Sequence, residues 1–175
     1  MGKIVLYIAQ SLDGFIADEN GKFDFLNDFM RPEEDYGYAE FLKTLGAVIM
    51  ATTTYKDILK LGFWYDGLEN HIFSNQLLTV PEGKTIQQHS GDPSALVAEL
   101  RQKEKDTWLV GGASLVTQFL NKGLLDELMV AIIPRTLGRG IPLFKDVDVR
   151  YAPELKGSKV FSDGVVMLHY VFANK

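Results

Sequence analysis

Short apolar runs and helix-like segments alternate along this 175-residue chain, and this alternation limits the possible folds more than any other feature. Residues 4–9 and 47–51 are apolar at both odd and even positions, which is typical of strands that are covered on both faces. Segments with apolar residues at helical spacing lie between such runs. The pattern predicts an α/β fold whose sheet is parallel over most of its width.

The remaining elements follow the same order, with one change at the C-terminal end. Further strands are predicted at residues 71–73, 107–110 and 128–133, and helices at residues 33–45, 53–61, 93–103 and 114–123. Near the end, residues 159–161 and 165–172 flank an Asp163-Gly164 turn, which predicts an antiparallel hairpin. We therefore expect one domain over residues 1–175, with three α/β/α layers and a mixed, mostly parallel central sheet.

Composition excludes several classes of function. The net charge of −5, from 23 acidic and 18 basic residues, argues against a nucleic-acid partner, which needs a basic surface. With no cysteine, the chain has no disulfide, no thiolate nucleophile and no cysteine-based zinc site, and its three histidines form no metal-ligand motif. The first residues do not form a signal peptide, and the longest later apolar run is too short to cross a bilayer. We expect a cytoplasmic protein without a membrane partner.

Small and hydroxyl-bearing residues gather where four predicted strands end. These segments are Ala9–Gly14, Ala51–Tyr55, Ser74-Asn75 and Gly111–Ser114. Ligands of open α/β sheets bind beyond the carboxyl ends of the strands, and backbone amides at helix N-termini suit a phosphate. Three of these segments also have a purely structural explanation: a tight turn at Gly111-Gly112, a helix N-cap at Thr52 or Thr53, and a turn at Asp13-Gly14.

Taken together and in this order, the motifs resemble those of a known family. Ser11–Ala17 matches its S-L-D-G-x-I-A signature, Val110–Leu115 its glycine pair, Leu125–Leu128 its L-D-E-L segment, and Pro134–Phe144 its P-x-x-x-G-x-G-x-P-L-F loop. The family is that of the reductase domain at the C-terminus of the bifunctional riboflavin-biosynthesis deaminase-reductase, the RibD C-terminal domain, which shares the dihydrofolate reductase fold. The chain is most similar to small stand-alone members that are called dihydrofolate reductase-like.

The resemblance implies a homodimeric NADPH-dependent reductase that transfers hydride to a C=N or C=O group of a small heterocyclic or sugar-derived substrate. It places Ala9 and Ile16 towards the nicotinamide end, Thr52, Thr53 and Thr54 at the pyrophosphate, and Ser74 and Asn75 by the adenosine ribose. Gly14 is also expected to bind the cofactor. It places Gly111, Gly112, Ala113, Ser114 and Leu115 on the other side of the pyrophosphate, with a cis bond between the two glycines.

Two departures from the family pattern leave parts of this assignment open. Thr52 stands where the family commonly has an arginine that faces the 2′-phosphate, so NADH is not excluded as the cofactor, although Lys84 or Asn75 could replace that arginine. No carboxylate aligns with the one that binds the pterin in dihydrofolate reductases, so folate reduction is not expected. The proton would come from water or from a carboxylate such as Asp13 or Asp35.

Other interpretations stay open at this stage. The chain could be a non-catalytic nucleotide-binding module that keeps the groove but has lost the chemistry. Reduction of an aminopyrimidine ribose phosphate is disfavoured, because these residues include no deaminase domain and few basic residues mark a substrate phosphate. The dense aromatics between Phe23 and Tyr38 suit either a wall for a planar ring or a locally packed lid. Phe63-Trp64-Tyr65 suits either the pocket or a dimer interface.

Overall fold

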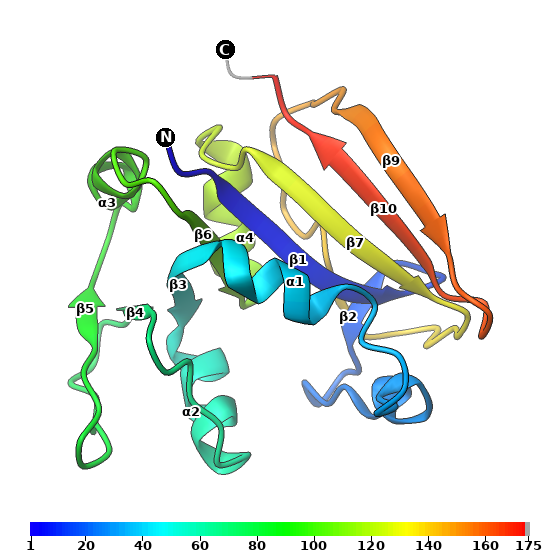
Figure 1. The fold of residues 1–175 in the computed structure, drawn as a ribbon, viewed down its shortest axis with the longest axis horizontal. Coiled ribbons are helices and arrows are strands. Elements are labelled where there is room, and N and C mark those ends of the chain that lie inside the picture. The colour runs from blue at the N-terminus through cyan, green and yellow to red at the C-terminus, as the bar shows by residue number, and fades with distance from the viewer. Residues whose placement is uncertain (174–175) are drawn as a thin grey trace.

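The computed structural model describes residues 1–173, and most of its strands belong to one eight-stranded sheet in the order β5-β4-β3-β6-β1-β7-β10-β9 (Figure 1). The strands are β1 (Ile4–Ser11), β3 (Leu45–Ala51), β4 (Glu69–Phe73), β5 (Gln87–His89), β6 (Asp106–Gly111), β7 (Glu127–Ile133), β9 (Glu154–Val160) and β10 (Val166–Val171). The first six are mutually parallel, and β10 is antiparallel to both β7 and β9. The predicted mostly parallel sheet with a C-terminal antiparallel hairpin is confirmed.

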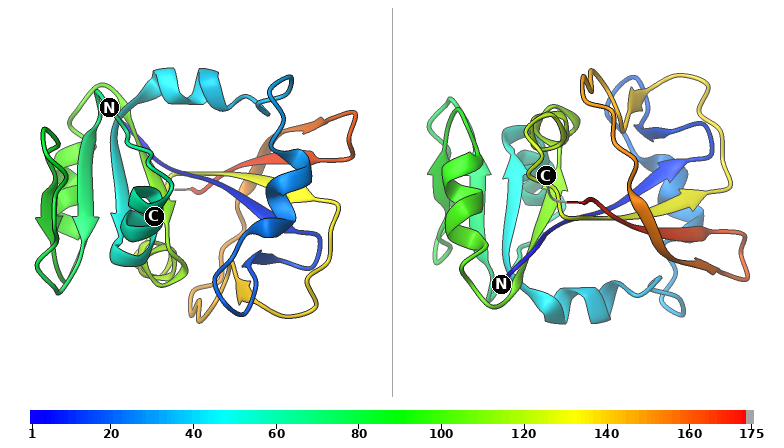
Figure 2. Two further views of the ribbon diagram at one scale, coloured as in Figure 1. Left: turned by 90° about the horizontal axis from the view of Figure 1, so that it is seen from below. Right: turned by 90° about the horizontal axis from the view of Figure 1, so that it is seen from above.

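Helices cover both faces of the sheet, which confirms the three layers. The α-helices are α1 (Tyr38–Thr44), α2 (Thr52–Lys60), α3 (Ser94–Leu100) and α4 (Ala113–Asn121), and a 3-10 helix, η1, spans Asp24–Phe29. Helices α3 and α4 pack on one face, whereas α1 and α2 pack on the other. Figure 2 shows α1 and α4 on opposite sides of the sheet.

The core is formed by strands whose side chains are apolar on both faces of the sheet. In β1, Ile4 and Leu6 face the α3/α4 layer, while Val5 between them faces the α1/α2 layer, and all three are buried. Phe119 of α4 is fully buried against the first layer, and Trp108 of β6 packs in the second. Burial of each such side chain contributes roughly 1.5–3 kcal/mol to folding.

A two-stranded antiparallel sheet, which the sequence did not predict, lies beside the end of β1. It consists of β2 (Phe15–Ala17) and β8 (Ile141–Pro142). Gly140, just before β8, approaches the backbone of β2 so closely that a Cβ there would lie 2.1 Å from the Ala17 carbonyl oxygen. The segment after β1 and the loop before β8 are therefore held together by backbone contacts.

The predicted helix over residues 33–45 is wrong at its start. Helix α1 begins only at Tyr38, because Tyr36 and Gly37 have left-handed backbone angles, with φ of 55° and 89°. Strand β3 already begins at Leu45. The predicted helix over residues 93–103 ends early, at Leu100. None of the described helices has the length and apolar character needed to cross a membrane.

Candidate functional site

Two adjoining cavities lie at the carboxyl ends of β3, β4 and β6. The first, the hydroxyl-rich cavity, has a volume of about 370 Å³ and is lined by Ala51, Thr52, Thr53, Phe73, Ser74, Asn75, Ser90, Gly91, Ser114, Leu115 and Gln118. The second, the apolar cavity, has a volume of about 610 Å³. Ala51, Thr53 and Ser114 line both cavities, so the two form one continuous groove, the strand-end groove.

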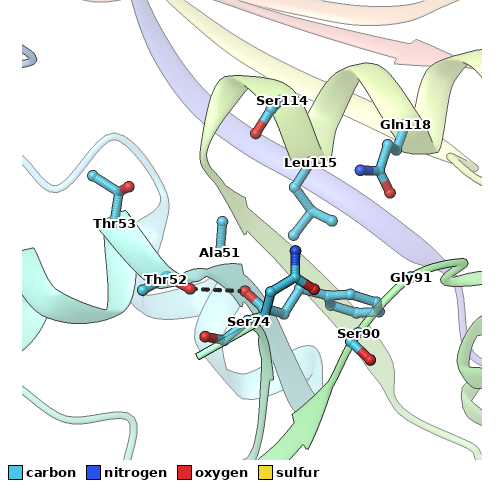
Figure 3. A pocket seen from close by; sticks show the side chains of 11 residues that line it. Ala51, Thr52, Thr53, Ser74, Ser90, Gly91, Ser114, Leu115 and Gln118 are labelled. Atoms are coloured by element: carbon cyan, nitrogen blue, oxygen red, sulfur yellow. Dashed lines mark hydrogen bonds between the residues drawn. The ribbon is translucent and has the colours of Figure 1, made fainter. Parts of the chain in front are cut away.

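The N-termini of two helices reach this groove from opposite sides. Helix α2 begins at Thr52 directly after β3, and α4 begins at Ala113 directly after β6. Figure 3 shows Thr52 and Thr53 of α2 across the hydroxyl-rich cavity from α4. The residues before these helices, Ala51 and Gly112, have no side chain that could cap them. Their first-turn N–H groups are therefore suited to bind an anion in the groove.

Hydroxyl and amide groups give the hydroxyl-rich cavity its polarity. The Thr52 hydroxyl donates to the Phe73 carbonyl at 3.2 Å and joins α2 to the end of β4 (Figure 3). Ser74 Oγ accepts from the Gln76 N–H at 3.1 Å and donates to its carbonyl at 2.8 Å. The lining residues, all within the described part of the chain, include no charged side chain.

The apolar cavity has a different lining. Its wall includes Ile8, Ile16, Ile58, Leu61 and Val110, together with the aromatic rings of Phe23 and Tyr65. Burial raises the pKa of the Tyr65 hydroxyl, so this group is neutral at physiological pH. Asp57, Lys145 and Asp146 supply the charged side chains of the lining. This cavity suits the flat, largely apolar rings of a small heterocycle.

The structure brings the predicted cofactor-binding residues together, with two exceptions. Those that line the strand-end groove are Ile16, Thr52, Thr53, Thr54, Ser74, Asn75, Gly111, Gly112, Ala113, Ser114 and Leu115. Ala9 and Gly14 line neither cavity: Ala9 pairs with Ala131 of β7, and Gly14 has a φ of 90° in the turn after β1. The bond between Gly111 and Gly112 is cis, as the family resemblance implied.

The two carboxylates predicted to donate a proton do not line either cavity. Asp13 accepts hydrogen bonds from the Ser11 hydroxyl at 2.5 Å and from the Leu137 and Gly138 N–H groups at 3.1 and 2.8 Å. Asp35 accepts from the Gly37 and Ala39 N–H groups, both at 2.9 Å. The hydroxyl and backbone N–H donors hold the pKa of Asp13 below its ordinary value, and backbone N–H donors do the same for Asp35. Both carboxylates therefore act as acceptors that fix local backbone.

Sequence reasoning missed several residues that line the groove, namely Ser90, Gly91, Gln118 and Lys145. Gln118 had a usable signal, because it lies four residues after Ser114 and therefore on the same face of α4. Ser90 and Gly91 had none, since they reach the groove only through the pairing of β5 with β4. The proposed substitute Lys84 lines neither cavity and instead pairs with Asp66 at 2.6 Å.

Comparison with known proteins shows to which family the chain belongs. The sequence model of the RibD C-terminal domain matches residues 68–167, which include the glycine pair and most of the C-terminal hairpin. The chain belongs to the RibD C-terminal domain family. YwjB of Bacillus subtilis (strain 168), whose function is uncharacterised, is 38% identical to the chain over 174 residues, which are 98% of each protein.

Solved structures place the RibD C-terminal domain in a wider fold group. A Shewanella sp. PV-4 protein, provisionally assigned to riboflavin biosynthesis, superposes with a TM-score of 0.87 at 26% identity, over 98% of this chain and 99% of that one. Dihydrofolate reductase from Enterococcus faecalis, in complex with NADP(H), superposes with a TM-score of 0.64 at 17% identity, over 98% and 96% of the two chains. The chain thus has the dihydrofolate reductase fold.

Proposed function

We propose that this RibD C-terminal domain is an NAD(P)H-dependent reductase whose dinucleotide lies along the strand-end groove. The observation that carries this proposal is the convergence of two helix N-termini without side-chain caps, those of α2 and α4, on a groove with one polar and one apolar end. Backbone N–H groups at such termini bind phosphate without the help of a positive side chain.

The groove residues divide by the part of the dinucleotide that they would hold. Thr53, Thr54 and Ser114 lie at the two helix starts and would hold the pyrophosphate. Ser74 and Asn75, at the end of β4, would lie beside the adenosine ribose. The nicotinamide ring would occupy the apolar cavity, where Ile16 is part of the wall. Thr53 and Ser114 line both cavities, so a pyrophosphate held there would lie between the two nucleosides.

When bound, the reduced nicotinamide supplies a hydride from its C4 atom, which reduces a C=N or C=O carbon of the substrate. The protein's own contribution is to orient the two rings in the apolar cavity. One proton must also reach the substrate nitrogen or oxygen. We propose that water delivers it, because Asp13 and Asp35 line neither cavity and are already bonded to several donors.

Turnover assays test the reductase proposal. The purified protein is mixed with NADPH or NADH and with pterins, aminopyrimidines and simple carbonyl compounds, and loss of the reduced nicotinamide is followed by its absorbance. Oxidation that requires both protein and substrate supports the proposal. A structural neighbour from Thermotoga maritima is described as a deaminase and 5-amino-6-(5-phosphoribosylamino)uracil reductase, which makes aminopyrimidines the first substrates to test. The expected homodimer stays a prediction, which light scattering from the same preparation would check.

A non-catalytic nucleotide-binding module is the second candidate. One observation favours it: the carboxylates that line the apolar cavity, Asp57 and Asp146, are not those that were predicted to donate a proton. Asp57 is paired with Lys60 at 3.1 Å, and Asp146 lies in a loop. Saturable nucleotide binding with no turnover across the whole substrate panel would favour this candidate. Oxidation of the nucleotide with any of the substrates would exclude it.

A further inference from the structure

Among the residues that the structure describes, those lining the hydroxyl-rich cavity include neither of the side-chain types by which proteins usually distinguish NADPH from NADH. A 2′-phosphate carries about −1.5 to −2 charge at neutral pH, as phosphate monoesters do, and arginine binds such a group through two parallel hydrogen bonds. Selection of the free 2′-hydroxyl commonly uses a carboxylate. The lining of the cavity is instead made of hydroxyl, amide and apolar side chains with backbone groups.

The lysines that follow the lining residues along α2 and α4 do not supply the positive charge that a 2′-phosphate would need. Lys56 follows Thr53 by three residues on α2, but its side chain is exposed and lines neither cavity. Lys122 lies one helical turn beyond Gln118, and its Nζ donates to Asp92 Oδ2 at 2.8 Å. Asp92 directly follows Gly91 of the cavity lining, and its carboxylate offsets the charge of Lys122.

The histidine beside the cavity is uncharged as well. His89 precedes Ser90, and its ring stacks on Phe73 with centroids 5.5 Å apart. Its Nε2 lies 3.0 Å from Nδ1 of the buried His71, so one of these two nitrogens must lack a proton. Burial lowers the pKa of His89, which keeps the ring neutral at physiological pH.

We propose that this domain binds NADPH and NADH with affinities that differ by no more than about tenfold, because the described residues that line the proposed adenosine cavity carry no charge and Lys122, the cation at the end of α4, is paired with Asp92. This inference rests on the proposed function, which places the adenosine end in that cavity. Hydroxyl and amide groups can donate to a phosphate oxygen or accept from a ribose hydroxyl, so they serve either nucleotide.

Equilibrium titrations test the inference without any turnover. Quenching of Trp64 and Trp108 fluorescence gives the dissociation constant of each reduced nucleotide at low and at physiological salt. The expected ratio of the two constants is at most about tenfold at both salt concentrations, since salt screens charge–charge contacts most. A preference for either nucleotide of more than about tenfold overturns this inference alone, whereas no saturable binding of either overturns the proposed function.

Two variants test the cause. Thr52→Arg places a guanidinium in the cavity and should tighten NADPH binding at least tenfold relative to NADH. Asp92→Asn should also shift the ratio towards NADPH, because it releases Lys122. It keeps the side-chain oxygen that accepts from the Ser94 N–H at the start of α3. Asp92→Asn therefore still tests the cause if the Thr52→Arg protein does not fold.

A matched control uses the same chemical change elsewhere. Asp66→Asn releases Lys84, which lines neither cavity, from an ion pair of 2.6 Å. It should leave the ratio of the two dissociation constants unchanged. An equal shift in Asp66→Asn and Asp92→Asn, or no shift in Asp92→Asn, would overturn the role of the Asp92–Lys122 pair.

Discussion

The carboxylate of Asp13 accepts a hydrogen bond of 2.8 Å from the backbone N–H of Gly138 and so ties the turn after β1 to the loop before β8. The Leu137 N–H donates to the same carboxylate. Strands β2 and β8 follow these two segments and pair with each other, and Ile16 and Ile141 from this pair line the apolar cavity. Asp13 thus positions one flank of the groove from outside it.

Asp13→Ala should lower the melting temperature at neutral pH, because two backbone N–H groups lose their acceptor. The pKa of Asp13 is lowered in the folded protein, so its stabilising effect is present above the unfolded value of about 3.9 and is lost as the pH falls further. Thermal unfolding followed by circular dichroism at pH 7 and pH 3 checks this. The difference in melting temperature between the variant and the parent should be smaller at pH 3. An equal difference at both pH values would contradict the stabilising role of the Asp13 carboxylate.

Gly140→Ala should be strongly destabilising and should weaken nucleotide binding, since its Cβ would meet the Ala17 carbonyl oxygen and separate β8 from β2. Gly138→Ala is the control, because its φ of 71° is also unfavourable for alanine but the space around it is open. We expect a cost of about 1 kcal/mol for the control and of several times that for Gly140→Ala. Urea unfolding measures both, and equal costs would argue against the close contact.

Ala113→Pro should raise the dissociation constant of either nucleotide about tenfold, because it removes one N–H from the first turn of α4. Proline is tolerated there: Ala113 is the first helical residue, and Gly112 before it has the extended angles that a following proline requires. Ala113→Ser changes only the side chain and keeps the N–H, so its affinity should stay near that of the parent. Equal weakening in both variants would mean that the side-chain change, and not the loss of the amide, lowers the affinity.

The stability of the protein should fall as the pH drops below about 6.5. Burial lowers the pKa of His71 and of His89, so the unfolded chain binds protons that the native chain does not. Nearby Glu69 opposes the shift of His71, and Lys103 adds to it. Each histidine can contribute at most about 1.4 kcal/mol per pH unit. Urea unfolding between pH 7.5 and 5.5 gives the slope of the free energy of unfolding against pH. This slope should be smaller in His89→Gln, and an unchanged slope would mean that other groups cause the loss of stability.

The sequence was sufficient to predict what depends on local pattern. The parallel strands were visible in their two-sided apolar runs, such as that of β3, and the strand-end groove in the residues that follow β3, β4 and β6. The hairpin at Asp163 was visible in its turn chemistry. These features depend on side-chain type within a few residues, which a single sequence records.

What the sequence did not predict depends on contacts between distant segments. The start of α1 was misplaced because the left-handed angle of Tyr36 is unusual for a tyrosine, whose hydroxyl bonds to Asp163 in the hairpin turn. Of β9, the sequence predicted only the end next to the turn, because this strand is exposed along its whole length, has no apolar alternation and is defined by its pairing with β10. Ser90 and Gly91 reach the groove through β5, an edge strand with two exposed glutamines.

The central claim is that a dinucleotide binds across the N-termini of α2 and α4, and amide hydrogen exchange with and without NADPH tests it most directly. The account predicts slower exchange on binding at the first turns of both helices, in residues 52–54 and 113–115. The backbone of β9, at the far edge of the sheet, should be unaffected. Saturating NADPH that leaves the exchange of both helix starts unchanged would contradict the account.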